Sequence, residues 1–123
     1  MKNIVLGALA LALMSVAPAI AQDVKAGKRV YKSCKACHSD KPGKHKNGPS
    51  LHNDVGSMAG QAEGYEYSEA MATSGLTWDV HTLSNFIRNP KEIVPDTKMA
   101  YGGLSDEQKL TDLIAYLETL KDE

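Results

Sequence analysis

Cys34-Lys35-Ala36-Cys37-His38 is the stretch of this sequence that decides the fold. Two cysteines separated by two residues and followed directly by a histidine form the pattern typical of covalent attachment of a c-type haem. The thiols add across the two vinyl groups of the macrocycle, and the adjacent histidine lies beneath the iron as its proximal ligand. The motif therefore predicts one covalent haem c, held by Cys34 and Cys37 and ligated by His38.

Three other interpretations of the two cysteines fit the surrounding sequence less well. A thioredoxin-like redox pair requires a βαβ setting, and no apolar strand precedes Cys34. A zinc site requires four ligands, and the four histidines of the chain contain no H-x(3–5)-H pair. A disulfide between Cys34 and Cys37 would close too small a loop to restrain the chain. Haem attachment is therefore the favoured interpretation.

Residues 1–21 are typical of a secretory signal peptide. Ile4 to Ala17 is apolar, and Ala19-Ile20-Ala21 supplies the small residues of a cleavage site. We expect cleavage before Gln22, export to the bacterial periplasm, and a mature domain of residues 22–123. An uncleaved membrane anchor is the alternative, but the apolar stretch is short for a bilayer span.

The remaining 102 residues are expected to form one small domain with a slight negative charge. The segment removed carries a single charged residue, Lys2, so 13 Lys and Arg remain against 15 Asp and Glu, a net charge of −2. This balance argues against nucleic-acid binding. One Trp and one Phe make a thin core, so a buried macrocycle would supply much of the missing apolar volume.

The spacing of apolar residues predicts an all-α fold with long loops. Helices are expected over residues 23–34, 68–72, 79–89 and 105–120. The first begins at Asp23 as N-cap and carries the cysteines at its end. Pro90 ends the third, and a capping box of Ser105 and Gln108 begins the last. No segment alternates with period two, so no strand is predicted.

Met99 is the candidate for the second axial ligand of the iron. It lies in the segment 89–103, a loop bounded by prolines and glycines, 61 residues after His38. A thioether is a soft ligand that favours ferrous iron, and Met/His ligation is typical of haem proteins that carry electrons. The alternative ligands are Met58, Met71, His45, His52 and His81, none of which has a rigid loop to position it.

The order of motifs resembles the class I cytochromes c, of the mitochondrial and bacterial c2 or c-550 type, over nearly the whole mature chain. The matching segments are Cys34–His38, Lys46–His52, Gly60–Ala70, Gly75–Trp78, Asn89–Lys91, Pro95–Met99 and Asp112–Leu117. The resemblance implies a fold in which the first and last helices cross at Gly27 and Tyr116. It also implies that Met99, in a P-x-x-x-M loop, is the distal ligand.

The resemblance further implies roles for residues around the haem. Pro49 is expected to accept a hydrogen bond from the proximal histidine through its carbonyl. Tyr67 and Trp78, helped by Thr97, are expected to bind a haem propionate.

Several positions depart from the mitochondrial pattern, and three of them are expected near the haem. Ser57 replaces an arginine that is common near the propionates, and Phe86 replaces a tyrosine that donates to the methionine sulfur. Met71 replaces a polar residue near the haem. These departures bear on the reduction potential and on the choice of partner, and not on the class of protein.

We therefore expect a soluble, monomeric, periplasmic one-electron carrier that is not an enzyme and does not bind nucleic acid. Its partners would be donor and acceptor redox proteins, such as a bc1-type complex, a terminal oxidase, a dehydrogenase or a photosynthetic reaction centre, with only transient contact to a membrane surface. Docking is expected at the haem edge through Lys35, Lys46, Lys91 and Lys98, with Tyr101 covering that edge. The alternative is a peroxidase-like haem enzyme or a ligand-binding sensor, which would need an open iron position.

Overall fold

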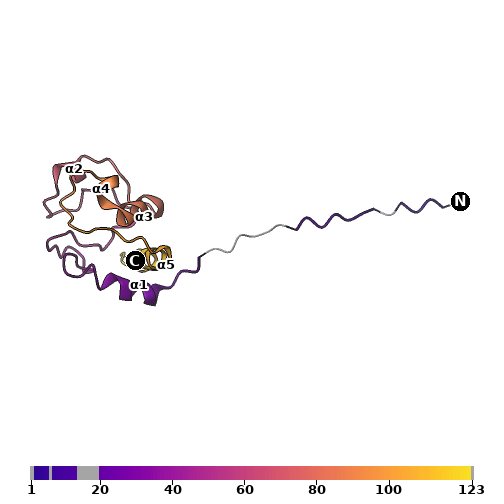
Figure 1. Cartoon of the computed structure of the whole chain (residues 1–123), viewed down its shortest axis with the longest axis horizontal. Helices are drawn as coiled ribbons and strands as arrows, with labels where there is room; N and C mark the ends of the chain where they lie inside the picture. The colour runs from indigo at the N-terminus through magenta and orange to yellow at the C-terminus, as the bar shows by residue number, and fades with distance from the viewer. Residues whose placement is uncertain (1, 6, 14–19, 123) are drawn as a thin grey trace.

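Helices and loops make up the whole of the described chain, residues 2–5, 7–13 and 20–122 of a computed structural model. The helices are α1 (Val24–Tyr31), α2 (Glu69–Ala72), α3 (Val80–Arg88), α4 (Pro90–Ile93) and α5 (Glu107–Glu118) (Figure 1). Within these residues no strand occurs, and one isolated bridge pairs Met58 with Thr77. The prediction of an all-α fold is confirmed.

Helix α1 begins where the sequence predicts and ends three residues earlier. The Asp23 carboxylate accepts a hydrogen bond from the Ala26 N–H at 3.0 Å, as an N-cap does. Beyond Tyr31 the chain continues in tighter turns, in which the Cys34 N–H donates to the Tyr31 carbonyl at 2.8 Å. The prediction that the helix extends to the cysteines is therefore wrong, because they lie in turns that follow it.

Helices α1 and α5 cross at a point where only glycine fits. A Cβ atom on Gly27 would lie 1.9 Å from the Asp112 carbonyl oxygen and 2.9 Å from the Tyr116 Cβ. The rings of Tyr31 and Tyr116 pack beside this point with centroids 5.2 Å apart, and both are buried. The predicted crossing at Gly27 and Tyr116 is confirmed.

Gly27→Ala is expected to lower the free energy of unfolding by about 2–3 kcal/mol, because the new methyl group forces the two helices apart. Helix propensity alone would favour alanine by about 1 kcal/mol. A net loss of stability in Gly27→Ala would therefore have to come from the packing of the two helices. Chemical denaturation of the haem-loaded protein measures this difference. Gly102→Ala is the control, since a Cβ there meets nothing within 4 Å, and equal stability of the two variants would contradict the tight crossing.

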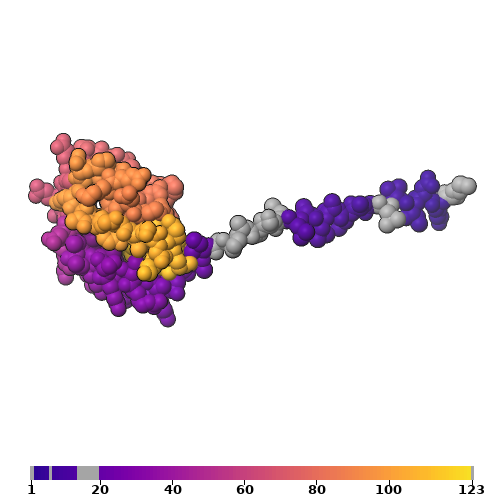
Figure 2. Space-filling view, viewed as in Figure 1, coloured from indigo at the N-terminus to yellow at the C-terminus, as the bar shows by residue number. Residues whose placement is uncertain are grey.

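The hydrophobic core lies between α3, α5 and the segment that carries Trp78. Trp78 and Phe86 are both buried and pack with ring centroids 4.9 Å apart. The other large buried residues of α3 and α5 are Leu83, Ile87, Leu110, Leu113, Ile114 and Leu117. In the space-filling view the C-terminal residues lie between the α1 region and the α3–α4 region, and so hold both together (Figure 2).

Two details around α3 and α5 differ from the prediction. Pro90 ends α3 as expected, but it also begins α4, because proline is favoured at the first position of a helix. The N-cap of α5 is Asp106, whose carboxylate accepts from the Lys109 N–H at 3.0 Å. The predicted capping box of Ser105 and Gln108 is therefore wrong by one residue, and the Gln108 side chain donates to Asp112 instead, at 2.9 Å.

Residues 2–5 and 7–13 extend away from the helices (Figure 1). Their apolar side chains, such as Leu9 and Leu13, are exposed, so they contribute nothing to the core. The predicted signal peptide, residues 1–21, falls partly on positions 1, 6 and 14–19, which lie outside the described residues. In the described part of the chain, no helix has the length and apolarity that a membrane crossing requires.

Candidate haem site

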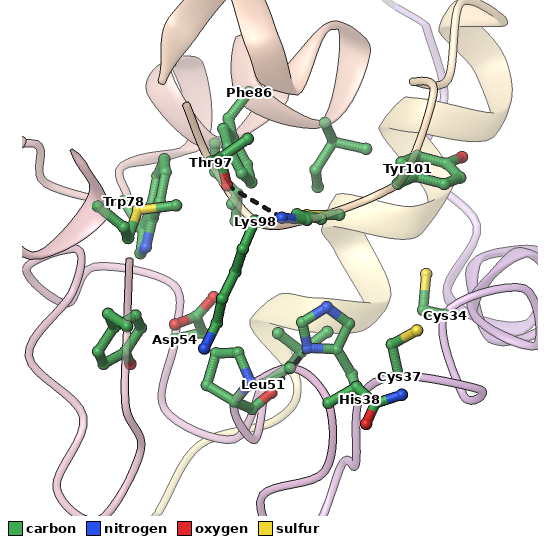
Figure 3. A pocket seen from close by; sticks show the side chains of 18 of the residues that line it. Cys34, Cys37, His38, Leu51, Asp54, Trp78, Phe86, Thr97, Lys98 and Tyr101 are labelled. Carbon is green, nitrogen blue, oxygen red and sulfur yellow. Dashed lines mark hydrogen bonds between the residues drawn. The ribbon is translucent and has the colours of Figure 1, made fainter. Parts of the chain in front are cut away.

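A cavity of about 420 Å³ separates the turns that carry the cysteines from the loop at residues 97–101 (Figure 3). Its size lies within the range of small-molecule and cofactor sites. Cys34, Cys37, His38 and Met99 all line it, so the structure brings together the residues of the motif and the candidate distal ligand. The rest of the lining is largely apolar and includes Leu51, Leu83, Phe86, Ile87, Leu113 and Leu117.

The His38 imidazole is held in the form that can ligate a metal. Its Nδ1 lies 2.7 Å from the Pro49 carbonyl oxygen. Because a carbonyl only accepts, Nδ1 must carry the proton, and this leaves the lone pair on Nε2. That nitrogen points into the cavity in Figure 3. Burial lowers the pKa of His38, against the opposing effect of the Pro49 carbonyl, so the ring stays neutral.

The backbone at Gly48 packs directly against this ring. A Cβ atom on Gly48 would lie 2.4 Å from the His38 Cε1 and 2.7 Å from its Nδ1. The Gly48 N–H donates to the Cys37 carbonyl at 2.7 Å, which ties this backbone to the motif. The space beside Gly48, which a single methyl group would fill, therefore sets the orientation of the His38 imidazole. The residues present fit a haem that is ligated from the His38 side of the cavity.

The two cysteines border the cavity without forming a disulfide. Cys34 is partly buried and Cys37 is exposed. Burial raises the pKa of the Cys34 thiol, so a neutral thiol is favoured over a thiolate. Among the residues that the structure describes, no group of three or more His, Cys, Asp and Glu side chains could hold a metal ion. The zinc interpretation thus lacks its further ligands in that part of the chain.

Met99 lies in a loop held by hydrogen bonds within the loop and to Val94. The buried Thr97 hydroxyl accepts a hydrogen bond from the Met99 N–H at 3.3 Å (Figure 3), and the Thr97 N–H donates to the Val94 carbonyl at 3.1 Å. Asp96 turns the chain with a φ of 67°. These contacts position the Met99 side chain in the cavity wall.

The other candidate ligands are placed less favourably, with one exception. Met71 also lines the cavity, whereas Met58 is 57% exposed and lies outside it. His45, His52 and His81 are absent from the lining, and His45 uses both ring nitrogens in contacts to Ser50 and Glu63. His38 is thus the one imidazole in the lining drawn from the described residues.

Tyr67, Trp78 and Thr97, which the resemblance assigns to a propionate, all line the cavity. The Tyr67 hydroxyl oxygen accepts from the Ala62 N–H at 3.1 Å, and burial raises the pKa of Tyr67. Of the three departures from the mitochondrial pattern, Phe86 and Met71 also line the cavity, whereas Ser57 does not.

Sequence reasoning missed Asp54, whose carboxylate borders the same cavity (Figure 3). No signal marks it, because Asn53-Asp54 in a polar stretch is typical of an exposed loop. Only the return of the chain around the cavity shows that this carboxylate faces inward.

The lysines proposed for docking differ in their surroundings. The Lys46 ammonium donates to the Lys35 carbonyl, and the Lys98 ammonium donates to the Glu66 carbonyl. Lys98 also lies 4.7 Å from the centroid of the Tyr65 ring. Lys91 is exposed on α4. Tyr101 lines the cavity on the side of Cys34 (Figure 3).

The fold and the cavity define a small helical protein built to enclose a haem that is attached through its own cysteines. The family model described as cytochrome c matches residues 24–121, and the chain belongs to this family. It carries one covalently attached haem c and is an electron-transfer protein, not an enzyme.

Relatives and a solved structure agree with this assignment. The chain is 47% identical to a cytochrome c2 of Blastochloris viridis over 119 residues, which cover 96% of this chain and 93% of that protein. It is 49% identical to a cytochrome c2 of Rhodopila globiformis over 96 residues, 77% of this chain and 91% of that one. The structure is similar to cytochrome cH from Methylobacterium extorquens, with a TM-score of 0.76 and 46% identity over 79% of this chain and 98% of that chain.

Proposed function

We propose that this chain is a periplasmic one-electron carrier with a low-spin haem ligated by His38 and Met99 and attached through Cys34 and Cys37. The observation that carries the proposal is that all four side chains border one cavity. When bound, the haem supplies the one-electron redox chemistry of its iron. We also propose that residues 1–21 are a signal peptide, because their described apolar side chains have no partner in the core.

The residues of the chain make electron transfer fast by keeping both sides of the site fixed. Pro49 and Gly48 hold the His38 ring from one side, and Thr97 holds the Met99 backbone on the other. Because neither support depends on a mobile side chain, little has to reorganise when the charge at the centre changes. The apolar lining excludes water, which favours exchange of an electron over reaction with a solvent-borne substrate.

The alternative, a peroxidase-like enzyme or a ligand sensor, requires an open iron position. Met99 in the cavity wall argues against it. An absorption spectrum distinguishes the two, because a Met–iron charge-transfer band near the red edge is expected for the carrier and not for an open site.

We propose that redox partners dock at the edge of the cavity near Tyr101, where lysines provide a local positive charge despite the net charge of −2. Charge of this kind raises the rate of encounter with an acidic partner and is screened by salt. Single exposed lysines have small effects on stability, so their contribution should be visible in kinetics alone.

Lys91→Glu is expected to slow electron exchange with an acidic redox protein by several-fold at low ionic strength, and to flatten the dependence of the rate on salt. Stopped-flow measurement of the second-order rate across ionic strength tests this. Lys25→Glu makes the same change of charge in the first turn of α1, the end farther from the cysteines, and should leave the dependence intact. A rate indifferent to both salt and Lys91→Glu would place docking on an apolar face or on another surface.

A further inference from the structure

Asp54 lies in the wall between two cavities. It lines the main cavity and also a smaller one of about 230 Å³. Tyr67 is the other residue common to both linings. The rest of the smaller cavity is mainly polar and includes the exposed residues Asn53, Met58 and Gln61. This cavity therefore connects the inner wall of the haem site with the surface of the protein.

The Asp54 carboxylate is chemically isolated in this wall. Among the residues that the structure describes, it is the one carboxylate that lines either cavity. Among the described residues, no side chain or backbone N–H donates a hydrogen bond to it, and no lysine, arginine or histidine forms an ion pair with it. The Ser57 hydroxyl, which stands where an arginine is common, donates at 2.6 Å to the backbone carbonyl of Asp54 and not to the carboxylate.

The groups that face Asp54 do not compensate its charge. His52 comes from its own segment, Tyr67 and Tyr65 from the chain before α2, Lys98 from the Met99 loop, and His38 from the haem motif. The Lys98 ammonium donates to the backbone carbonyl of Glu66, and among the described residues its charge forms no ion pair with Asp54. The nearby Asp54 carboxylate adds to the rise in the Tyr67 pKa. The side chains that α3 and α5 contribute to the main cavity are all apolar. Desolvation accordingly raises the pKa of Asp54 to about 7.

We propose that Asp54 binds a proton when the haem is reduced and releases it when the haem is oxidised, so that it sets a pH dependence of the reduction potential. With haem bound, a donor protein would supply one electron to the site, and the Asp54 carboxylate would take up one proton from the hydronium or buffer acid of the solvent. Reduction removes one positive charge from the site, which makes an uncompensated carboxylate beside it less favourable. The smaller cavity gives the proton its route from solvent. This inference rests on the proposed one-electron function.

The midpoint potential of the haem-loaded protein should fall as pH rises through the range around 7. We expect proton binding at Asp54 to be about tenfold tighter in the reduced than in the oxidised protein, a difference of one pKa unit. Asp54→Asn, which has nearly the same shape, should lose this step. Asp54→Leu serves the same purpose should the asparagine variant fold poorly.

His52→Gln is the matched control, because it removes another ionisable side chain that lines the smaller cavity. His52→Gln should keep the pH-dependent step in the midpoint potential. Any separate step from the haem propionates should be the same in the wild type and in all of these variants. If Asp54→Asn and Asp54→Leu both show the pH profile of the wild type, the inference is overturned.

Unfolding provides a readout that does not depend on electron transfer. The pKa of Asp54 is raised in the folded state, so its contribution to stability is fully present below the unfolded value near 4 and is lost as pH rises through about 7. The wild type should therefore lose stability relative to Asp54→Asn between about pH 4 and pH 7, and the difference should level off above that, in denaturant titrations of the oxidised protein. A constant difference would overturn the inference. Absence of a reversible one-electron couple, with this stability effect intact, would instead refute the proposed function.

Discussion

A protein in which Cys34 and Cys37 are both replaced by serine is expected to hold no haem and to be largely unfolded. The thiols are the two groups that can bond covalently to the macrocycle at this end of the cavity. Without the macrocycle, an apolar space of about 420 Å³ stays unfilled, and a domain of this size has little other core to offset the loss. A group that binds only the folded state contributes its binding free energy to folding.

Acid–acetone extraction and circular dichroism measure the two parts of this expectation. In the wild type the colour should stay with the protein after extraction, and the double serine variant should be colourless with little helical signal. Lys35→Gln changes a residue between the cysteines and should retain both haem and helix. Colour that moves into the organic phase from the wild type would refute covalent attachment, and a well-folded serine variant would show that the macrocycle is not needed for the core.

The sequence could predict the helices because their signals are local. Asp23, Ser68 and Asp79 each cap a helix that the sequence predicts. Two of the errors arise where two local signals compete. At the start of α5, Ser105 and Asp106 are both good caps, and the register of the helix selects Asp106. At Pro90, the same residue that ends α3 is also suited to begin α4.

The residues of the candidate site also fall into two groups, those that a local motif predicts and those that only the folded chain reveals. Cys34, Cys37 and His38 form a contiguous motif, and their place in the cavity wall follows from its spacing. Asp54 belongs to no motif, and its inward position depends on how the chain between Leu51 and Tyr67 returns to the cavity. Gly48 lies within the matching segment Lys46–His52, but only the folded structure shows that its missing side chain makes room for the His38 ring. Long-range packing determines both the inward position of Asp54 and the space beside Gly48, and the local sequence carries no signal for it.

Met99→Ala is expected to open the iron and convert an electron carrier into a ligand-binding protein. Met99 borders the cavity from a loop held by the Thr97 hydroxyl. A ligand tethered in this way competes with external ligands at a high effective concentration, so its removal should raise the affinity for cyanide by about 100-fold or more. Loss of the soft thioether should also lower the reduction potential, because a thioether favours ferrous iron.

Met71 makes this experiment decisive, because its thioether lines the same cavity. If Met99 is the ligand, Met71→Ala should keep the low-spin spectrum and the weak binding of cyanide, and the exposed Met58→Ala should behave in the same way. A Met99→Ala variant that retains a Met-type spectrum would contradict the assignment, and loss of that spectrum in Met71→Ala would transfer the role to α2. Met71 sits on a helix of four residues, whereas Met99 follows a turn fixed at Asp96 and Thr97. The more restrained loop is the better support for a ligand that must stay in place while the charge on the iron changes.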